Sequence, residues 1–123
     1  MDVQRTVDYY ADLTAGDLCQ CATCRNYMLR IKAAYPEVAQ YLQTMGVDIE
    51  KPFEAMPLPP CPDGTIEYMA VQYIVMGTDA GFEKTAVGGV NIEMAESYPF
   101  TDIAEDHFVI ELAPITLKWG IPE

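Results

Sequence analysis

The stretch Ile66–Gly77, "IEYMAVQYIVMG", decides the fold because it is long, apolar and almost free of charge. Apolar residues stand at both odd and even positions, the pattern of a strand that is buried on both faces. Glu67 is its one charged residue, and its tyrosines, valines and isoleucines are residue types that strands favour. We therefore expect Ile66–Gly77 to form the central strand of a sheet.

Two later stretches are expected to return beside this strand. The first, Thr85–Glu96, reads "TAVGGVNIEMAE", and its Gly88-Gly89 pair indicates a bulge or a bend. The second, His107–Trp119, reads "HFVIELAPITLKW", and Pro114 within it indicates an edge position or a break. The connections are too short for crossover helices, so the sheet is expected to be mostly antiparallel.

The segment before the central strand, Glu50–Gly64, contains five of the nine prolines of the chain. This density excludes a regular helix or a central strand and favours a stiff, extended connector. The sequence "PDGT" at its end predicts a turn into the strand. The connector is expected to carry Cys61 back across the molecule.

A helical pattern begins at about Ala22. Its apolar positions recur at alternating steps of three and four residues, which predicts an amphipathic helix. They are Met28, Ile31, Tyr35, Val38, Leu42 and Met45. Pro36 interrupts the pattern, so the segment forms either one helix kinked at this proline or two short helices. We favour two helices, with Pro36 at the first position of the second helix and Gly46 at the end.

The first segment, Val3–Leu13, alternates between apolar and polar residues and is expected to form a half-buried strand. At 123 residues and 13.7 kDa the chain is long enough for one domain with its own core. We predict a single α+β domain over residues 1–123. In it, a mostly antiparallel sheet packs against a short helical pair.

The chain has 7 Lys and Arg against 19 Asp and Glu, a formal charge of −12. An acidic surface repels phosphate groups, so nucleic acid and anionic membranes are excluded as expected partners. The N-terminus lacks the apolar core of a signal peptide, and no stretch has the length of a membrane-spanning helix. We expect a cytosolic protein, in which cysteines stay reduced.

Three of the four cysteines, Cys19, Cys21 and Cys24, fall within "CQCATC", and Cys61 is remote. Zinc in structural sites takes four ligands in a tetrahedron, and these four thiolates would close such a site. We predict that they hold a structural Zn²⁺. His107 is an alternative to Cys61 as the remote ligand, and an iron–sulfur cluster fits the same number of thiolates.

The pair Cys21-Ala-Thr-Cys24 also has the spacing of thiol–disulfide oxidoreductases, with Cys21 as nucleophile and Cys24 as resolving thiol. The third interpretation is that the cysteines are reduced thiols without a function.

Other catalytic patterns are missing from the sequence. The chain has one serine, Ser97, outside a nucleophile elbow, and Glu105-Asp106-His107 is expected to be a solvated loop. We therefore predict no catalytic residue and a non-enzymatic binding or interaction module, whose partner is another protein or a second copy of the chain.

Four segments resemble a family of small bacterial proteins of unknown function. They are "CQCATCRNY", "YPEVAQYLQTMGVDIEKPFE", "YIVMG" and "HFVIELAPITLKW". The cysteine cluster and the "GVDIEKPFE" segment carry the resemblance most specifically. It implies a bacterial, cytosolic, single-domain protein, and it brings no catalytic residue with it.

Overall fold

The computed structural model describes residues 1–120, which form an α+β fold with a six-stranded antiparallel sheet. The helices are α1 (Val3–Asp12), α2 (Ala22–Ala34) and α3 (Pro36–Thr44), with a short 3-10 helix at Ala15–Asp17. The strands are β1 (Glu54–Pro57), β2 (Thr65–Met76), β3 (Thr85–Val87), β4 (Val90–Met94), β5 (His107–Ala113) and β6 (Ile115–Lys118). The expected fold class is confirmed.

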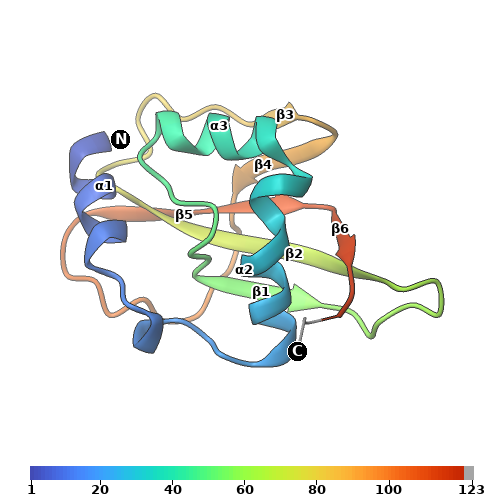
Figure 1. The fold of residues 1–123 in the computed structure, drawn as a ribbon. Helices are drawn as coiled ribbons and strands as arrows, with labels where there is room; N and C mark the ends of the chain where they lie inside the picture. Colours follow the sequence, from blue (N-terminus) through green and yellow to red (C-terminus); the bar gives the residue numbers. More distant parts are fainter. Residues whose placement is uncertain (121–123) are drawn as a thin grey trace.

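Strand β2 is the centre of the sheet, as its apolar run predicts (Figure 1). The order across the sheet is β1-β2-β5-β4-β3, and β6 pairs with the first part of β2. Tyr68 shows how the strand is enclosed, because its register partners are Pro57 of β1 and Ile115 of β6. The proline-rich connector therefore contributes a short edge strand, β1, and is otherwise irregular.

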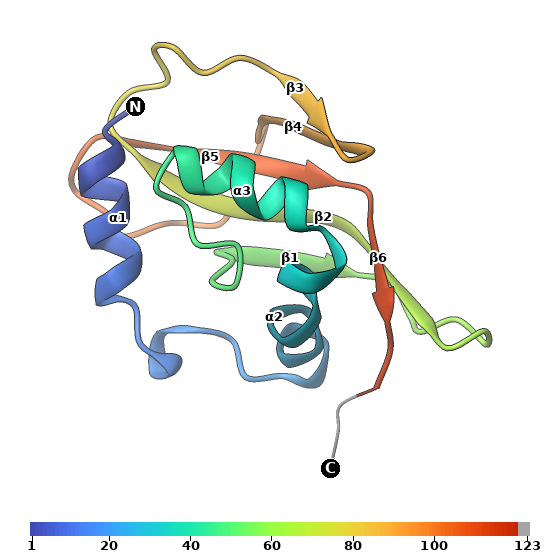
Figure 2. The same cartoon turned by 45° about the horizontal axis from the view of Figure 1, so that its top comes forward.

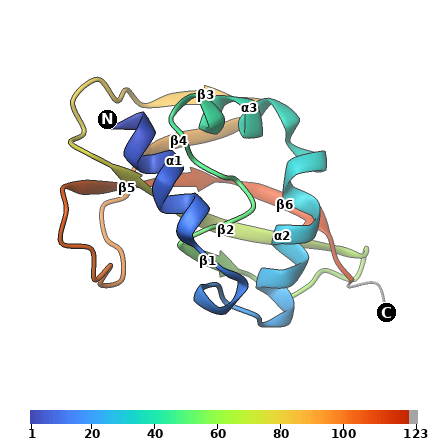
Figure 3. The ribbon, with the colours of Figure 1, turned by 60° about the vertical axis from the view of Figure 1, so that its left-hand side comes forward.

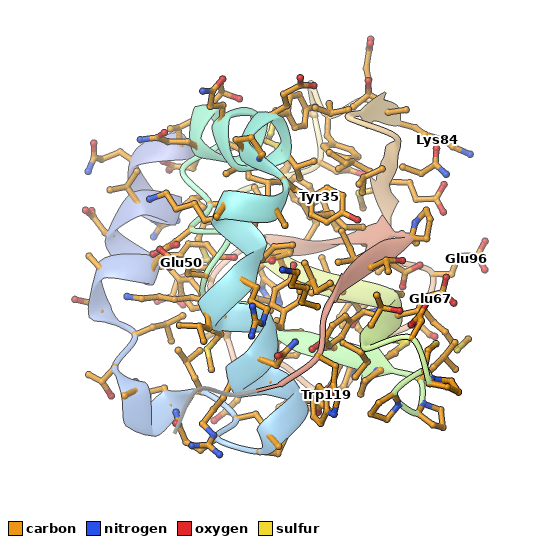
Figure 4. All side chains as sticks on the ribbon, turned by 45° about the vertical axis from the view of Figure 1, so that its right-hand side comes forward. Tyr35, Glu50, Glu67, Lys84, Glu96 and Trp119 are labelled. Carbon is orange, nitrogen blue, oxygen red and sulfur yellow. The ribbon has the colours of Figure 1, made fainter. Side chains whose placement is uncertain are left out.

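The three helices cover one face of the sheet (Figures 2 and 3). The main core lies between them and β2, with Ile31 of α2 and Leu42 of α3 fully buried against Tyr73. A smaller cluster around Ile74 and Val109 lies on the opposite face, under the segment between β4 and β5. Figure 4 shows the labelled Glu67, Glu96 and Lys84 on this opposite side, away from α2.

The predicted strand over Val3–Leu13 is wrong, because this segment forms helix α1. The Asp2 side chain caps the helix by accepting a hydrogen bond from the Arg5 backbone N–H. Thr6 and Tyr10, one turn apart, are the two buried residues of the helix, and they bond to the end of β2. A helix satisfies the backbone of this segment internally and still buries these two side chains on one face.

The interpretation of two helices separated at Pro36 is confirmed. Pro36 occupies the first position of α3, where its missing N–H is not needed. Gly46 follows α3 with a φ of +83°, the left-handed conformation that ends helices. With α1, three helices cover the sheet, where the sequence predicts a pair.

The stretches Thr85–Glu96 and His107–Trp119, each predicted as one strand, each form two strands in the structure. Gly88 and Gly89 have positive φ angles of 56° and 82° and form a tight turn between β3 and β4, so this segment is a hairpin and the predicted single strand is wrong. The break predicted at Pro114 is confirmed, since it separates β5 from β6 at a cis peptide bond.

Candidate metal centre

The loop before α2 is held by its own side chains. Thr14 and Asp17 form a capping box around the 3-10 helix, in which Asp17 Oδ2 accepts from the Thr14 backbone N–H at 2.8 Å. The Gln20 side-chain amide donates to the Ala15 carbonyl at 2.7 Å and to the Leu18 carbonyl at 3.3 Å. These bonds fold the loop back on itself and bring Cys19 to the start of α2.

The first two turns of α2 are hydrogen-bonded to two strands that are distant in sequence. Asn26 is fully buried, and its side-chain nitrogen donates to the Lys118 carbonyl at 2.9 Å. The Tyr68 hydroxyl on β2 donates to the Thr23 carbonyl at 2.5 Å. Displacing a buried, hydrogen-bonded amide costs free energy. The backbone that carries Cys21 and Cys24 is therefore held in place at the start of α2.

The sulfur atoms of Cys19, Cys21 and Cys24 all lie within 4.8 Å of one another. The Cys19 thiol donates to the Cys21 sulfur at 3.1 Å. Bonds of 2.3 Å in tetrahedral zinc place sulfur atoms about 3.8 Å apart, so small adjustments bring all three onto one ion. Cys19 and Cys21 are exposed and Cys24 is half-buried, which leaves an ion accessible from the solvent.

The environment lowers the pKa of the Cys21 thiol to about 6. The Thr23 hydroxyl, 3.3 Å from the Cys21 sulfur, is the largest cause, followed by the Cys19 thiol and the Cys24 backbone N–H. Cys21 is also the N-cap residue of α2, a position where the helix dipole favours a thiolate. At neutral pH this cysteine therefore carries the charge that a metal ligand or a nucleophile needs.

Cys24 has the opposite character. Burial raises the pKa of its thiol well above the ordinary value, and its hydrogen bonds with Cys19 and Cys21 raise it further. Cys24 keeps its proton at neutral pH unless a cation takes the place of that proton. The cluster thus combines an exposed thiolate, Cys21, with a half-buried and protonated thiol, Cys24.

The structure does not bring Cys61 into this group. Cys61 is exposed in the turn between β1 and β2, where its backbone N–H donates to the Thr65 carbonyl at 2.7 Å. Figure 1 shows this turn projecting away from the start of α2. His107 is not in the group either, since its ring nitrogens pair with the Thr101 hydroxyl and the Glu105 carbonyl, each at 2.8 Å.

A small cavity of about 50 Å³ adjoins two of the three cysteines, Cys19 and Cys24. Cys19, Cys24 and Met28 line one side of it, and Phe53 and Glu54 of the connector line the other. In the sequence, Met28 is one of the apolar positions of the predicted helix and is not among the predicted ligands. The signal that could have identified it is its spacing, because Met28 follows Cys24 by four residues and so shares its helix face.

Within residues 1–120, the three cysteines are the one group of three or more Cys, His, Asp or Glu side chains that lies close enough to hold an ion. The same residues contain no helix with both the length and the apolar character that crossing a bilayer requires. The family resemblance of the cysteine segment stays a prediction. Comparisons of the chain with models of known families, with curated proteins and with solved structures found no match.

Proposed function

We propose that this chain is a metal-binding module in which the thiolates of Cys19, Cys21 and Cys24 hold a thiophilic ion, the class of ion to which the Zn²⁺ predicted from the sequence belongs. The observation that carries the proposal is the mutual distance of the three sulfur atoms, all within 4.8 Å. Thiolates are the preferred ligands of such ions, and one of the three is already ionised at neutral pH. No step of catalysis is needed to explain the cluster.

The ion has a local structural role in this proposal. It links the loop that carries Cys19 to the first turn of α2, which holds Cys24. The hydrophobic core forms without it, because all four cysteines are exposed or half-buried and stand outside the core. Removal of the ion is therefore expected to loosen the loop and to leave the sheet folded.

The test is metal titration of reduced, metal-free protein under anaerobic conditions, against a chromophoric chelator. We expect one Zn²⁺ per chain, weaker binding in Cys19→Ser and Cys24→Ser, and unchanged binding in the matched control Cys61→Ser. Hydrogen exchange before and after chelation then shows whether protection is lost in the loop alone. Wild-type affinity in Cys24→Ser, or no binding at all, would refute the proposal.

A second function, thiol–disulfide exchange, is favoured by one specific observation. Cys21 is exposed with a lowered pKa and Cys24 is shielded with a raised one, the asymmetry expected of a nucleophile and a resolving thiol. In this reaction the Cys21 thiolate attacks a substrate disulfide and releases one thiolate. Cys24 gives its proton to the thiolate released in the first step and attacks the mixed disulfide, which releases the second thiolate and leaves a Cys21–Cys24 disulfide.

The two functions separate in one experiment with Cys24→Ser. If the chain is an oxidoreductase, the Cys24→Ser variant accumulates a mixed disulfide with a model disulfide such as oxidised glutathione. Mass spectrometry then places the adduct on Cys21. If Cys21 forms no adduct faster than Cys61 does, the oxidoreductase interpretation fails. In the wild type, prior loading with Zn²⁺ is expected to block the reaction of Cys21 with the disulfide, because both functions use the same sulfur.

A further inference from the structure

We infer that the site selects Cu(I) over Zn²⁺ and that the Met28 thioether supplies a further ligand to the ion. The inference rests on the proposed metal-binding function and names the ion and a residue that determines its choice. It depends on the position of Met28 beside the thiols and on the chemistry of a sulfur-only ligand set.

Met28 lies next to the cysteine cluster in the fold. It stands one turn after Cys24 on α2, so the two side chains share one face of the helix. Both line the cavity of about 50 Å³, which Cys19 also borders. A cavity needs roughly 10–15 Å³ of such space to hold one water molecule, so this cavity has room for a single ion beside the side chains that line it.

The donor atoms of this site favour Cu(I). Thiolate and thioether sulfur are soft ligands and select soft ions such as Cu(I). Zn²⁺ in proteins takes thiolate, imidazole and carboxylate ligands and requires a fourth one to complete its tetrahedron. Cu(I) accepts three sulfur ligands without a fourth, and a thioether adds to them without adding charge. The structure brings three thiols together, and the fourth thiol, Cys61, is elsewhere.

Oxygen ligands are the alternative that would favour Zn²⁺. Asp17 and Glu54 border the same cavity. One carboxylate oxygen of Asp17 already accepts two hydrogen bonds from Thr14, at 2.8 and 3.0 Å. One oxygen of Glu54 accepts from the Ala55 backbone N–H at 3.1 Å. These bonds engage one oxygen of each carboxylate with protein donors, and ligation by the Met28 thioether displaces none of them.

The experiment compares Cu(I) and Zn²⁺ affinities of reduced protein by anaerobic chelator competition. The variants are Met28→Leu, which keeps the size and apolar character of the side chain, and Glu54→Gln. Met69→Leu is the control, since Met69 is 57% exposed on β2. We expect Met28→Leu to weaken Cu(I) binding roughly tenfold, the scale of loss on changing groups around a metal, and to leave Zn²⁺ binding and both affinities of Met69→Leu unchanged.

A direct readout supplements the affinities. In selenomethionine-labelled protein, X-ray absorption of bound copper is expected to show a copper–selenium distance that disappears in Met28→Leu. Full Cu(I) affinity in Met28→Leu with no such distance would overturn the inference. Tighter binding of Zn²⁺ than of Cu(I) by the wild type would overturn it as well, and loss of that Zn²⁺ binding in Glu54→Gln would identify a zinc site with an oxygen ligand. Binding of neither ion by the wild type would instead refute the metal-binding function itself.

Discussion

The hydroxyl of Thr23 is the largest single cause of the low pKa of Cys21, and replacing Thr23 by valine tests this directly. The hydroxyl oxygen lies 3.3 Å from the Cys21 sulfur. Valine keeps the shape of threonine, and the bond from the Tyr68 hydroxyl survives because it ends on the Thr23 backbone carbonyl. The variant therefore removes one hydrogen bond and leaves the clamp on α2 in place.

The expected change follows from the strength of that bond. A hydrogen bond to a charged group contributes about 1.5–3 kcal/mol, and solvent screening at exposed Cys21 favours the lower end. Since one pKa unit corresponds to about 1.4 kcal/mol, we expect the pKa of Cys21 to rise by about one unit, from about 6 to about 7. The sign is upward because the lost bond stabilises the thiolate.

The assay is the rate of alkylation by iodoacetamide as a function of pH, in metal-free, reduced protein. Fragment-ion mass spectrometry assigns the product to Cys21. Near pH 6 the rate in Thr23→Val is expected to be roughly fivefold lower than in the wild type, because the thiolate fraction falls by that factor. Thr44→Val is the control, since the Thr44 hydroxyl bonds to the Tyr41 carbonyl on α3. An unmoved midpoint in Thr23→Val, or an equal shift in Thr44→Val, would contradict the reasoning.

Three further substitutions test the fold and the limits of the site. Cys61→Ser is expected to keep the metal stoichiometry and affinity of the wild type, as measured by chelator competition. Gly46→Ala is expected to lower the free energy of unfolding in urea by roughly 1–3 kcal/mol, because φ is +83° and a Cβ would lie 2.6 Å from the Val3 carbonyl. Tyr73→Phe is expected to cost about 1–3 kcal/mol in the same assay, because it removes the buried hydroxyl that donates to the Ile49 carbonyl. A loss under about half a kcal/mol in either of the last two variants would show that the contact contributes little.

The sequence predicts those elements that are determined by local chemistry. Strand β2 is recognisable because its apolar residues stand at odd and even positions and are rich in the valine, isoleucine and tyrosine side chains that strands favour. The break at Pro36 is recognisable because proline lacks the N–H that a helix interior needs. The cysteine spacing likewise predicts that Cys19, Cys21 and Cys24 meet, since they are at most five residues apart.

The errors concern segments whose conformation depends on distant partners. In α1, Thr6 is buried because its hydroxyl accepts from the backbone N–H of Met76, which is 70 residues away. No pattern within Val3–Leu13 reports this contact, so the weak alternation of the segment is misleading. The position of Cys61 is equally hard to predict from the sequence. Its prolines indicate that the connector is stiff, but they do not show toward which part of the fold the connector runs.

The three neighbouring cysteines lie at the surface, outside the hydrophobic core, next to a buried and fully hydrogen-bonded asparagine. Exposed neighbouring thiols are a liability, since they oxidise readily, and the core does not use them for packing. The protein nevertheless buries Asn26 and binds both of its side-chain ends, to Lys118 and Gly120, at the turn that carries the thiols. Burying an amide costs free energy unless every group is paired, and an apolar residue would serve packing alone at lower risk. These bonds fix the start of α2 against β2 and the end of β6, and a fixed backbone at this point is what the proposed metal site requires to keep the three sulfur atoms together.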